Sequence, residues 1–138
     1  MRGQATLSFI LLVSGVILEV AVAGSFVAYF FSASGYGERV SARALAAARA
    51  GLEDAEIQVA RNKEYGGGST ATYSFSVGDD VAEVTVSRTT DSPNNTYLFT
   101  ITAVGTAFTR ERRLLATMVV DRTSGVARLQ SLSEQGVD

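Results

Sequence analysis

The feature that most constrains this chain is an apolar run close to its amino terminus. From Leu7 to Phe31 the run carries one charged residue, Glu19. As a helix, about 25 residues extend roughly 37 Å at 1.5 Å per residue. Because the hydrocarbon core of a bilayer is about 30 Å thick, such a segment can cross a membrane with some tilt. The sequence therefore predicts a membrane-spanning helix over residues 4–34.

A cleaved secretory signal is the alternative interpretation of this run. The apolar region of such a signal normally has about 7–15 residues and ends at a small-residue site. Ala21-Val22-Ala23 offers such a site, but the apolar run continues well beyond it, and the one amino-terminal charge is Arg2. A retained membrane anchor fits these residues better.

The acid inside the run, Glu19, has two interpretations. A carboxyl group at mid-bilayer costs about 2.5–3.5 kcal/mol on insertion scales for comparable charged groups, and less if it is protonated. Glu19 is either a neutral acid bonded within its own helix or a group that faces other helices and finds a donor there. Small residues that would permit close helix approach recur nearby: Gly15, Ala21, Gly24, Ser25 and Ala28. We expect Glu19 to make an intramembrane assembly contact.

Composition narrows the chemistry that the chain can perform. Its 138 residues suffice for one domain plus an anchor. It has no Cys and no His, which excludes disulfides and thiolate zinc sites and removes the commonest general base and metal ligand. The net charge is −2 without a basic stripe, so nucleic acid is a possible but unsupported partner. We expect that the protein is not an enzyme and that it binds no cofactor and no metal.

A second helical pattern follows the apolar run over residues 35–62. Gly35 and Gly37 mark either a break or a flexible stretch where the helix leaves the membrane. A narrow apolar stripe then recurs at three- and four-residue steps, and the helix should end near Asn62. We expect the stripe to pack on a sheet, with pairing to another subunit as the alternative; it consists of Leu45, Ala48, Leu52, Ala55 and Val59.

The second half of the chain changes to a period of two. Four alternating runs, at residues 70–77, 81–90, 96–107 and 112–121, predict a four-stranded antiparallel sheet over residues 69–122. The polar remainder, residues 123–138, is either a fraying tail or a short added element. The fold class expected is α+β, a long amino-terminal helix whose amphipathic second half packs on this sheet.

Two charged motifs in the sheet region are candidate binding sites. Asp79-Asp80 could be a calcium-ligand pair, but acids in a hairpin turn need no metal to explain them. Arg110, Arg112 and Arg113 form the one basic cluster. It is either a solvated strand end or a contact for an anionic surface polymer or DNA phosphates, by charge alone.

The stretch "MRGQATLSF" places a very short leader directly before the apolar helix. It resembles the class III leader of type IV prepilins. The resemblance implies a three-residue leader, cleavage between Gly3 and Gln4 by a prepilin peptidase, and N-methylation of Gln4. Most major pilins carry Glu at the fifth residue after the cut, where this chain has Ser8, which favours a minor pilin or pseudopilin. A cut after Ser14 would make Glu19 the fifth residue, but with a long apolar leader.

The segment "AARAGLEDAE" is similar to the region after the membrane span in minor pilins of the PilX type. Together with the leader and anchor, this resemblance covers roughly the first 60 residues. It implies a structural subunit of a type IV pilus or type II secretion-like filament. Before assembly it would be a single-pass membrane protein with its head outside the cytoplasm. Its partners would be other pilin subunits and the inner-membrane assembly machinery. The alternative is a membrane-anchored β-rich binding domain that forms no filament.

Overall fold

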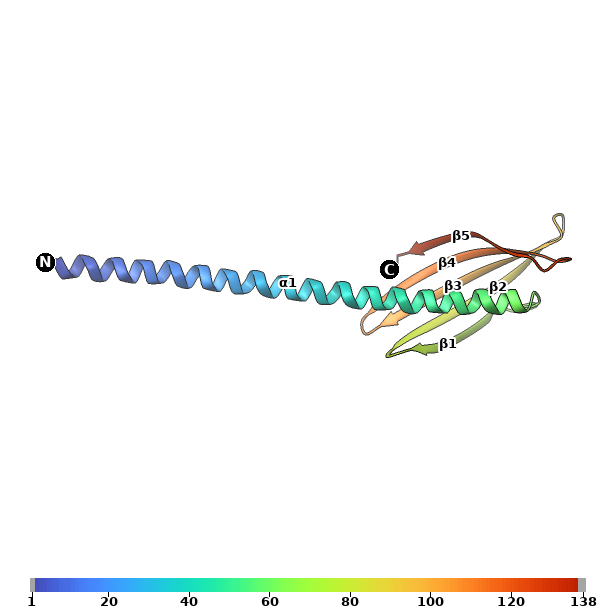
Figure 1. Cartoon of the computed structure of the whole chain (residues 1–138), viewed down its shortest axis with the longest axis horizontal. Helices are drawn as coiled ribbons and strands as arrows, with labels where there is room; N and C mark the ends of the chain where they lie inside the picture. The colour runs from blue at the N-terminus through green and yellow to red at the C-terminus, as the bar shows by residue number, and fades with distance from the viewer. Residues whose placement is uncertain (1, 137–138) are drawn as a thin grey trace. The chain divides into compact units, whose positions relative to one another are not determined.

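The computed structural model describes residues 2–136, with side chains from Leu7 to Gly136. In this part of the chain the helix is α1 (Arg2–Arg61). It is followed by β1 (Ala71–Val77), β2 (Asp80–Asp91), β3 (Thr96–Ala107), β4 (Arg110–Asp121) and β5 (Ala127–Gln135) (Figure 1). The chain divides into two compact units, an amino-terminal unit (Met1–Glu38) and a carboxyl-terminal unit (Arg39–Asp138), and α1 contributes to both.

The helix does not break at the glycine pair. Gly35 and Gly37 both lie within α1 in helical conformation, so of the two alternatives the break is wrong. Each glycine costs about 1 kcal/mol relative to alanine in a helix interior. Long helical segments flank the pair, and propagating an existing helix adds one hydrogen bond per residue without a new nucleation cost. The helix ends at Arg61, beside the expected end at Asn62.

The α+β fold, with a long helix packed on an antiparallel sheet, is confirmed. The sheet is a meander of order β1-β2-β3-β4-β5, in which each strand pairs with its neighbour in sequence. It has five strands, so the expected count of four was wrong. The additional strand, β5, forms within the segment 123–138 that was expected to be a polar tail or short element.

A β-bulge explains why β5 carried no clear alternation. Thr117 pairs with Ser131 and the next residue, Met118, pairs with Leu129, so Gln130 is an extra residue in β5. The bulge brings Leu129 and Leu132 to one face of the strand, although their spacing of three would place them on opposite faces of a regular strand. Both leucines remain about half exposed.

The core lies between the sheet and the part of α1 in the carboxyl-terminal unit (Figure 1). Alternate residues of the central strands face the helix, and along β3 the alternation of buried and half-buried side chains is strict. Burying each large apolar side chain stabilises the fold by about 1.5–3 kcal/mol. The largest fully buried side chains are Val59, Val84, Val86, Phe99, Ile101 and Val120.

The structure places the expected apolar stripe of the helix in this core. Ala48, Leu52, Ala55 and Val59 are buried against the sheet, and Leu45 packs at the edge of the same cluster, partly exposed. The buried face is wider than the stripe, because it also includes Val40, Ala44, Ala47 and Gly51. The added residues are mostly small, which allows the helix backbone to approach the sheet closely.

Candidate functional site

The amino-terminal unit is apolar around its whole circumference. Every described side chain from Leu7 to Tyr36 is exposed, and most of the exposed large apolar residues of the described chain lie in this segment. By length and composition, α1 from Leu7 to Arg61 is the one helix among the described residues that could cross a membrane. A helix that is apolar on all sides needs an apolar environment on all sides, either lipid or other protein.

Glu19 lies in the middle of this apolar surface. Its side chain is exposed, and it makes no hydrogen bond or ion pair within the described part of the chain. By contrast, the Ser25 hydroxyl donates to the carbonyl of Ala21 at 2.9 Å and so is satisfied inside its own helix. A carboxyl group in an apolar environment is strongly favoured to find a partner, because it is costly to leave without one. The geometry leaves all of the hydrogen-bonding capacity of Glu19 available to another molecule.

The expected processing site falls at the start of α1. Gly3 and Gln4 lie before Leu7, outside the residues whose surroundings the structure describes. The cleavage and methylation assigned to them from the leader resemblance therefore stay predictions.

Aromatic residues gather where the apolar run ends, a feature that the sequence reasoning missed. They are Phe26, Tyr29, Phe30, Phe31 and Tyr36, and all are exposed. The rings of Tyr29 and Phe30 lie edge to face, with centroids 6.1 Å apart. Tyr and Trp are enriched where a membrane helix meets the headgroups, and Tyr29 and Tyr36 fit this tendency. Their clustering at one end of the run was the sequence signal available.

The three arginines of the basic cluster do not form one patch. Arg112 pairs with Glu134 of β5 at 3.0 Å, so its charge is matched. Arg113 is half-buried on the opposite face of β4, and its buried Nε has no hydrogen-bond partner. Arg110 lies exposed at the first position of β4. Because the strand alternates, the cluster seen in sequence is divided between two faces.

Asp80 is occupied by a structural ion pair. Arg43 of α1 donates to both of its carboxylate oxygens, with Nε to Oδ2 at 3.0 Å and Nη2 to Oδ1 at 2.8 Å. Asp80 is nearly buried, whereas the Arg43 side chain is about half exposed. This bidentate pair joins the helix to the first residue of β2 and gives the acid a structural role. No group of three or more metal-ligating side chains occurs in the described part of the chain.

A second polar cluster holds the segment after α1 onto the sheet. Glu64 accepts a hydrogen bond from Arg88 at 2.6 Å and another from the Tyr97 hydroxyl at 3.0 Å. The Arg88 guanidinium also lies 4.2 Å from the centre of the Tyr97 ring, a cation–π contact. The hydrogen bond from Arg88, followed by that from Tyr97, holds the pKa of Glu64 below its usual value. These groups satisfy one another, which is typical of a structural clamp.

A tyrosine–aspartate pair ties the edge strand β1 to the helix. The Tyr73 hydroxyl donates to Oδ2 of Asp54 at 2.7 Å. Burial, together with the adjacent Asp54 carboxylate, raises the pKa of the Tyr73 hydroxyl, so it stays protonated as a donor. This pair, like the other two polar contacts, joins elements that are distant in sequence.

No family model matches the chain, and no curated protein or solved structure matches it. The chain itself supplies two features from which a function can be inferred. One is the apolar part of α1 from Leu7 to Tyr36, which contains a single acid, and the other is a sheet covered by the rest of the helix.

Proposed function

We propose that this protein is a structural subunit of a type IV pilus or type II secretion-like filament, as a minor pilin or pseudopilin. The observation that supports it is the combination of two features: apolar surface on all sides of α1 from Leu7 to Tyr36, and a Glu19 carboxyl without a partner among the described residues. Lipid satisfies the apolar surface but supplies no donor at mid-bilayer. A bundle of helices satisfies both requirements.

In this proposal the helix has two successive environments. It anchors the subunit in the membrane before assembly and lies in the filament core afterwards, as a cell-surface or periplasmic fibre. Glu19 follows Gln4 by fifteen residues, roughly 22 Å along a helix. In a staggered bundle, Glu19 would meet the charged amine or a polar group of a subunit displaced by about that distance. A β-carbon at Gly15 or Gly24 would have no described atom within 4 Å apart from the adjacent residues and the nearby backbone of its own helix, so both positions are open to a neighbouring helix.

Intact-mass measurement of the protein from its native membrane tests the proposal. Loss of Met1 to Gly3 together with one added methyl group on Gln4 is the expected result. An uncut chain would overturn it in favour of a plain membrane-anchored binding domain, and a chain that begins at Gly24 would indicate ordinary signal cleavage after Ala23. Gly3→Leu is the matched variant, and it should retain the full amino terminus.

Orientation in the membrane provides a second, independent test. Arg39, Arg43 and Arg49 follow the apolar run, whereas Arg2 alone precedes it. The positive-inside tendency by itself would keep the head in the cytoplasm, while the proposed function requires it outside. Because the chain has no Cys, Ser76→Cys on the exposed side of β1 creates a single reporter thiol. Labelling of this thiol in intact cells by an impermeant maleimide is expected, and labelling only after lysis would contradict the proposal.

A further inference from the structure

The turn between β3 and β4 contains a non-glycine residue, Phe108, in a left-handed backbone conformation. Ala107 pairs with Arg110, so the turn consists of Phe108 and Thr109. Phe108 has φ of +52° and is 80% exposed. Left-handed φ disfavours a residue with a β-carbon, and a bulky side chain there is a genuine outlier.

The same sheet contains a matched turn with the expected residue. Between β1 and β2, Val77 pairs with Asp80, and the first turn residue is Gly78 with φ of +63°. In a meander, the β1–β2 and β3–β4 turns lie at the same end of the sheet (Figure 1). The chain therefore uses glycine in one turn and an exposed aromatic in the other. Strained positions of this kind are candidates for function.

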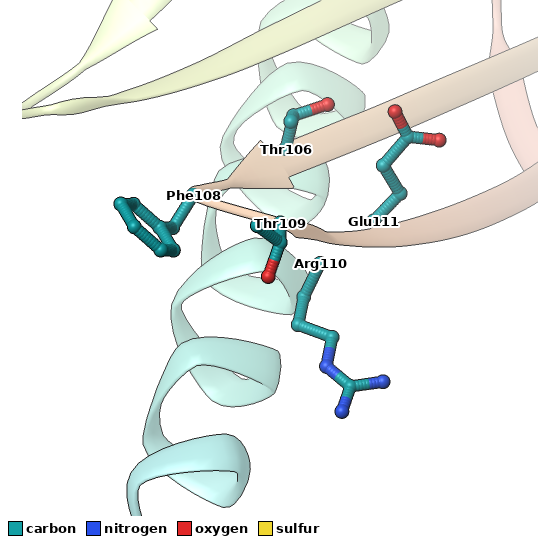
Figure 2. A pocket seen from close by; sticks show the side chains of 5 residues that line it. All are labelled: Thr106, Phe108, Thr109, Arg110 and Glu111. Atoms are coloured by element: carbon teal, nitrogen blue, oxygen red, sulfur yellow. The ribbon is translucent and has the colours of Figure 1, made fainter.

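Arg110, two residues after Phe108, adds a positive charge without a matching acid among the described residues. Arg110 is exposed and makes no ion pair or side-chain hydrogen bond in the described part of the chain. Figure 2 shows the Phe108 ring and the Arg110 guanidinium projecting from the turn, while Glu111 points to the opposite side from Arg110. The hollow at the turn, about 310 Å³, is lined by this one hairpin, so it is a surface recess and not an enclosed ligand site.

The fold also limits how far this turn can lie from the apolar run. Ala107, next to Phe108, is buried in a small cluster with Val40 and Ala44 of α1. Val40 follows Phe31, the last residue of the apolar run, by nine positions. A connection of that length cannot span more than about 30 Å even when fully extended. Once the run lies in a bilayer, the turn is tethered within reach of the membrane surface at a high effective concentration.

We propose that the β3–β4 turn docks on the membrane surface. The Phe108 ring inserts at the boundary between headgroups and acyl chains, and Arg110 pairs with the phosphate of an anionic lipid. A lipid surface fits these residues better than a protein partner does, because one exposed ring beside one cation forms no extended apolar patch. This inference requires the membrane anchor only, so it stands or falls separately from filament assembly.

Tryptophan fluorescence tests this contact, because the chain contains no Trp. Full-length Phe108→Trp is reconstituted in phosphatidylcholine vesicles with and without phosphatidylglycerol, and brominated lipids serve as contact quenchers. Val126→Trp is the matched control, since Val126 is half exposed in the β4–β5 loop at the opposite end of the sheet. Bromolipid should quench Phe108→Trp but not Val126→Trp, and Arg110→Gln should remove the enhancement by phosphatidylglycerol. Equal quenching of the two tryptophans would overturn the proposal. Blue-shifted emission from Phe108→Trp without quenching by bromolipid would also overturn it, because it would indicate a contact with protein.

A second variant separates lipid contact from folding. Phe108→Gly places the favoured residue at a left-handed position, so it should raise the unfolding midpoint while removing the ring. Hydrogen exchange of the amides of residues 106–111 is compared between vesicles and detergent. The parent chain should exchange several-fold more slowly in vesicles, as expected for an occluded turn, and Phe108→Gly should exchange equally in both. Equal exchange of the parent chain in the two environments would also overturn the proposal.

Discussion

Gly105 of β3 lies directly against the backbone of Ala48 in α1. A β-carbon at position 105 would overlap the backbone nitrogen of Ala48 and the carbonyl oxygen of Ala44. Both obstacles are backbone atoms of a helix, which cannot rotate away as a side chain can. This contact sets how closely α1 approaches the sheet, and it explains why small residues line the buried face of the helix.

Gly105→Ala is therefore expected to push α1 away from β3. Overpacking a tight core costs about 1–3 kcal/mol, and we expect the upper end of this range because backbone must move. Urea unfolding of the full chain in detergent micelles, followed by circular dichroism, measures the change in the free energy of unfolding.

Gly51→Ala is the matched control on the helix side of the same interface. A β-carbon at position 51 would lie 2.9 Å from Cγ2 of Val84, a side-chain atom. Replacing glycine by alanine in a helix interior gains about 1 kcal/mol, which offsets part of the crowding. The net change should stay within about 1 kcal/mol. A Gly105→Ala variant as stable as Gly51→Ala would show that the close approach at Gly105 does not constrain the fold.

Asp80→Asn should destabilise the carboxyl-terminal unit. It weakens the bidentate pair with Arg43, and hydrogen bonds to charged groups contribute about 1.5–3 kcal/mol. Glu134→Gln removes the partner of Arg112 in a pair whose two side chains are both more than two-fifths exposed. Such a surface pair is worth about 0–1 kcal/mol. Unfolding free energies should rank Asp80→Asn well below Glu134→Gln, and the reverse order would contradict the structural role given to Asp80.

Stability should fall in acid partly through Glu64. Its pKa is lowered in the folded state by the hydrogen bonds from Arg88 and Tyr97. The stabilisation is therefore complete above the usual carboxyl pKa of about 4.3 and is lost as pH falls through the lower folded value. Glu64→Gln should flatten the decline in unfolding midpoint between about pH 5 and pH 3.

Glu83→Gln is the control for this measurement, because Glu83 is exposed on β2 and makes no side-chain hydrogen bond in the described chain. Its acid profile should match that of the parent. Identical profiles for Glu64→Gln and the parent would show that the clamp is not coupled to protonation.

Glu19→Leu should separate insertion from assembly. Removing the acid favours insertion by about 3 kcal/mol on insertion scales, so the membrane-bound fraction should be at least that of the parent. Incorporation into sheared filaments should fall about tenfold or more, which corresponds to about 1.4 kcal/mol. Val20→Leu, at the adjacent apolar position, is the control and should assemble normally. Equal filament yield from Glu19→Leu and Val20→Leu would show that Glu19 makes no assembly contact and is a neutral acid tolerated within its own helix.

Much of the secondary structure of the carboxyl-terminal unit could be predicted from the local hydrophobic pattern. The alternation of Tyr97, Phe99 and Ile101 predicted β3 with the bounds that the structure has, because one face of a strand is buried and the other is not. The helical spacing of Leu52, Ala55 and Val59 placed them on one face for the same reason. By contrast, the cluster of Arg110, Arg112 and Arg113 appeared continuous in sequence and is divided by the strand's two faces.

The sequence by itself determined that residues 7–31 form an apolar segment long enough to cross a membrane, and it determined the helix-then-sheet order, since both follow from hydropathy and its period along the chain. Tertiary structure alone decided that residues 127–135 become a strand. Their alternation is interrupted at Gln130, and they gain hydrogen bonds only from the open edge of β4. It also decided the contact of Gly105 with Ala48 and the pairing of Arg43 with Asp80. Such contacts join residues that are distant in sequence, and the local hydrophobic periodicity of a segment does not predict which other segment it will contact.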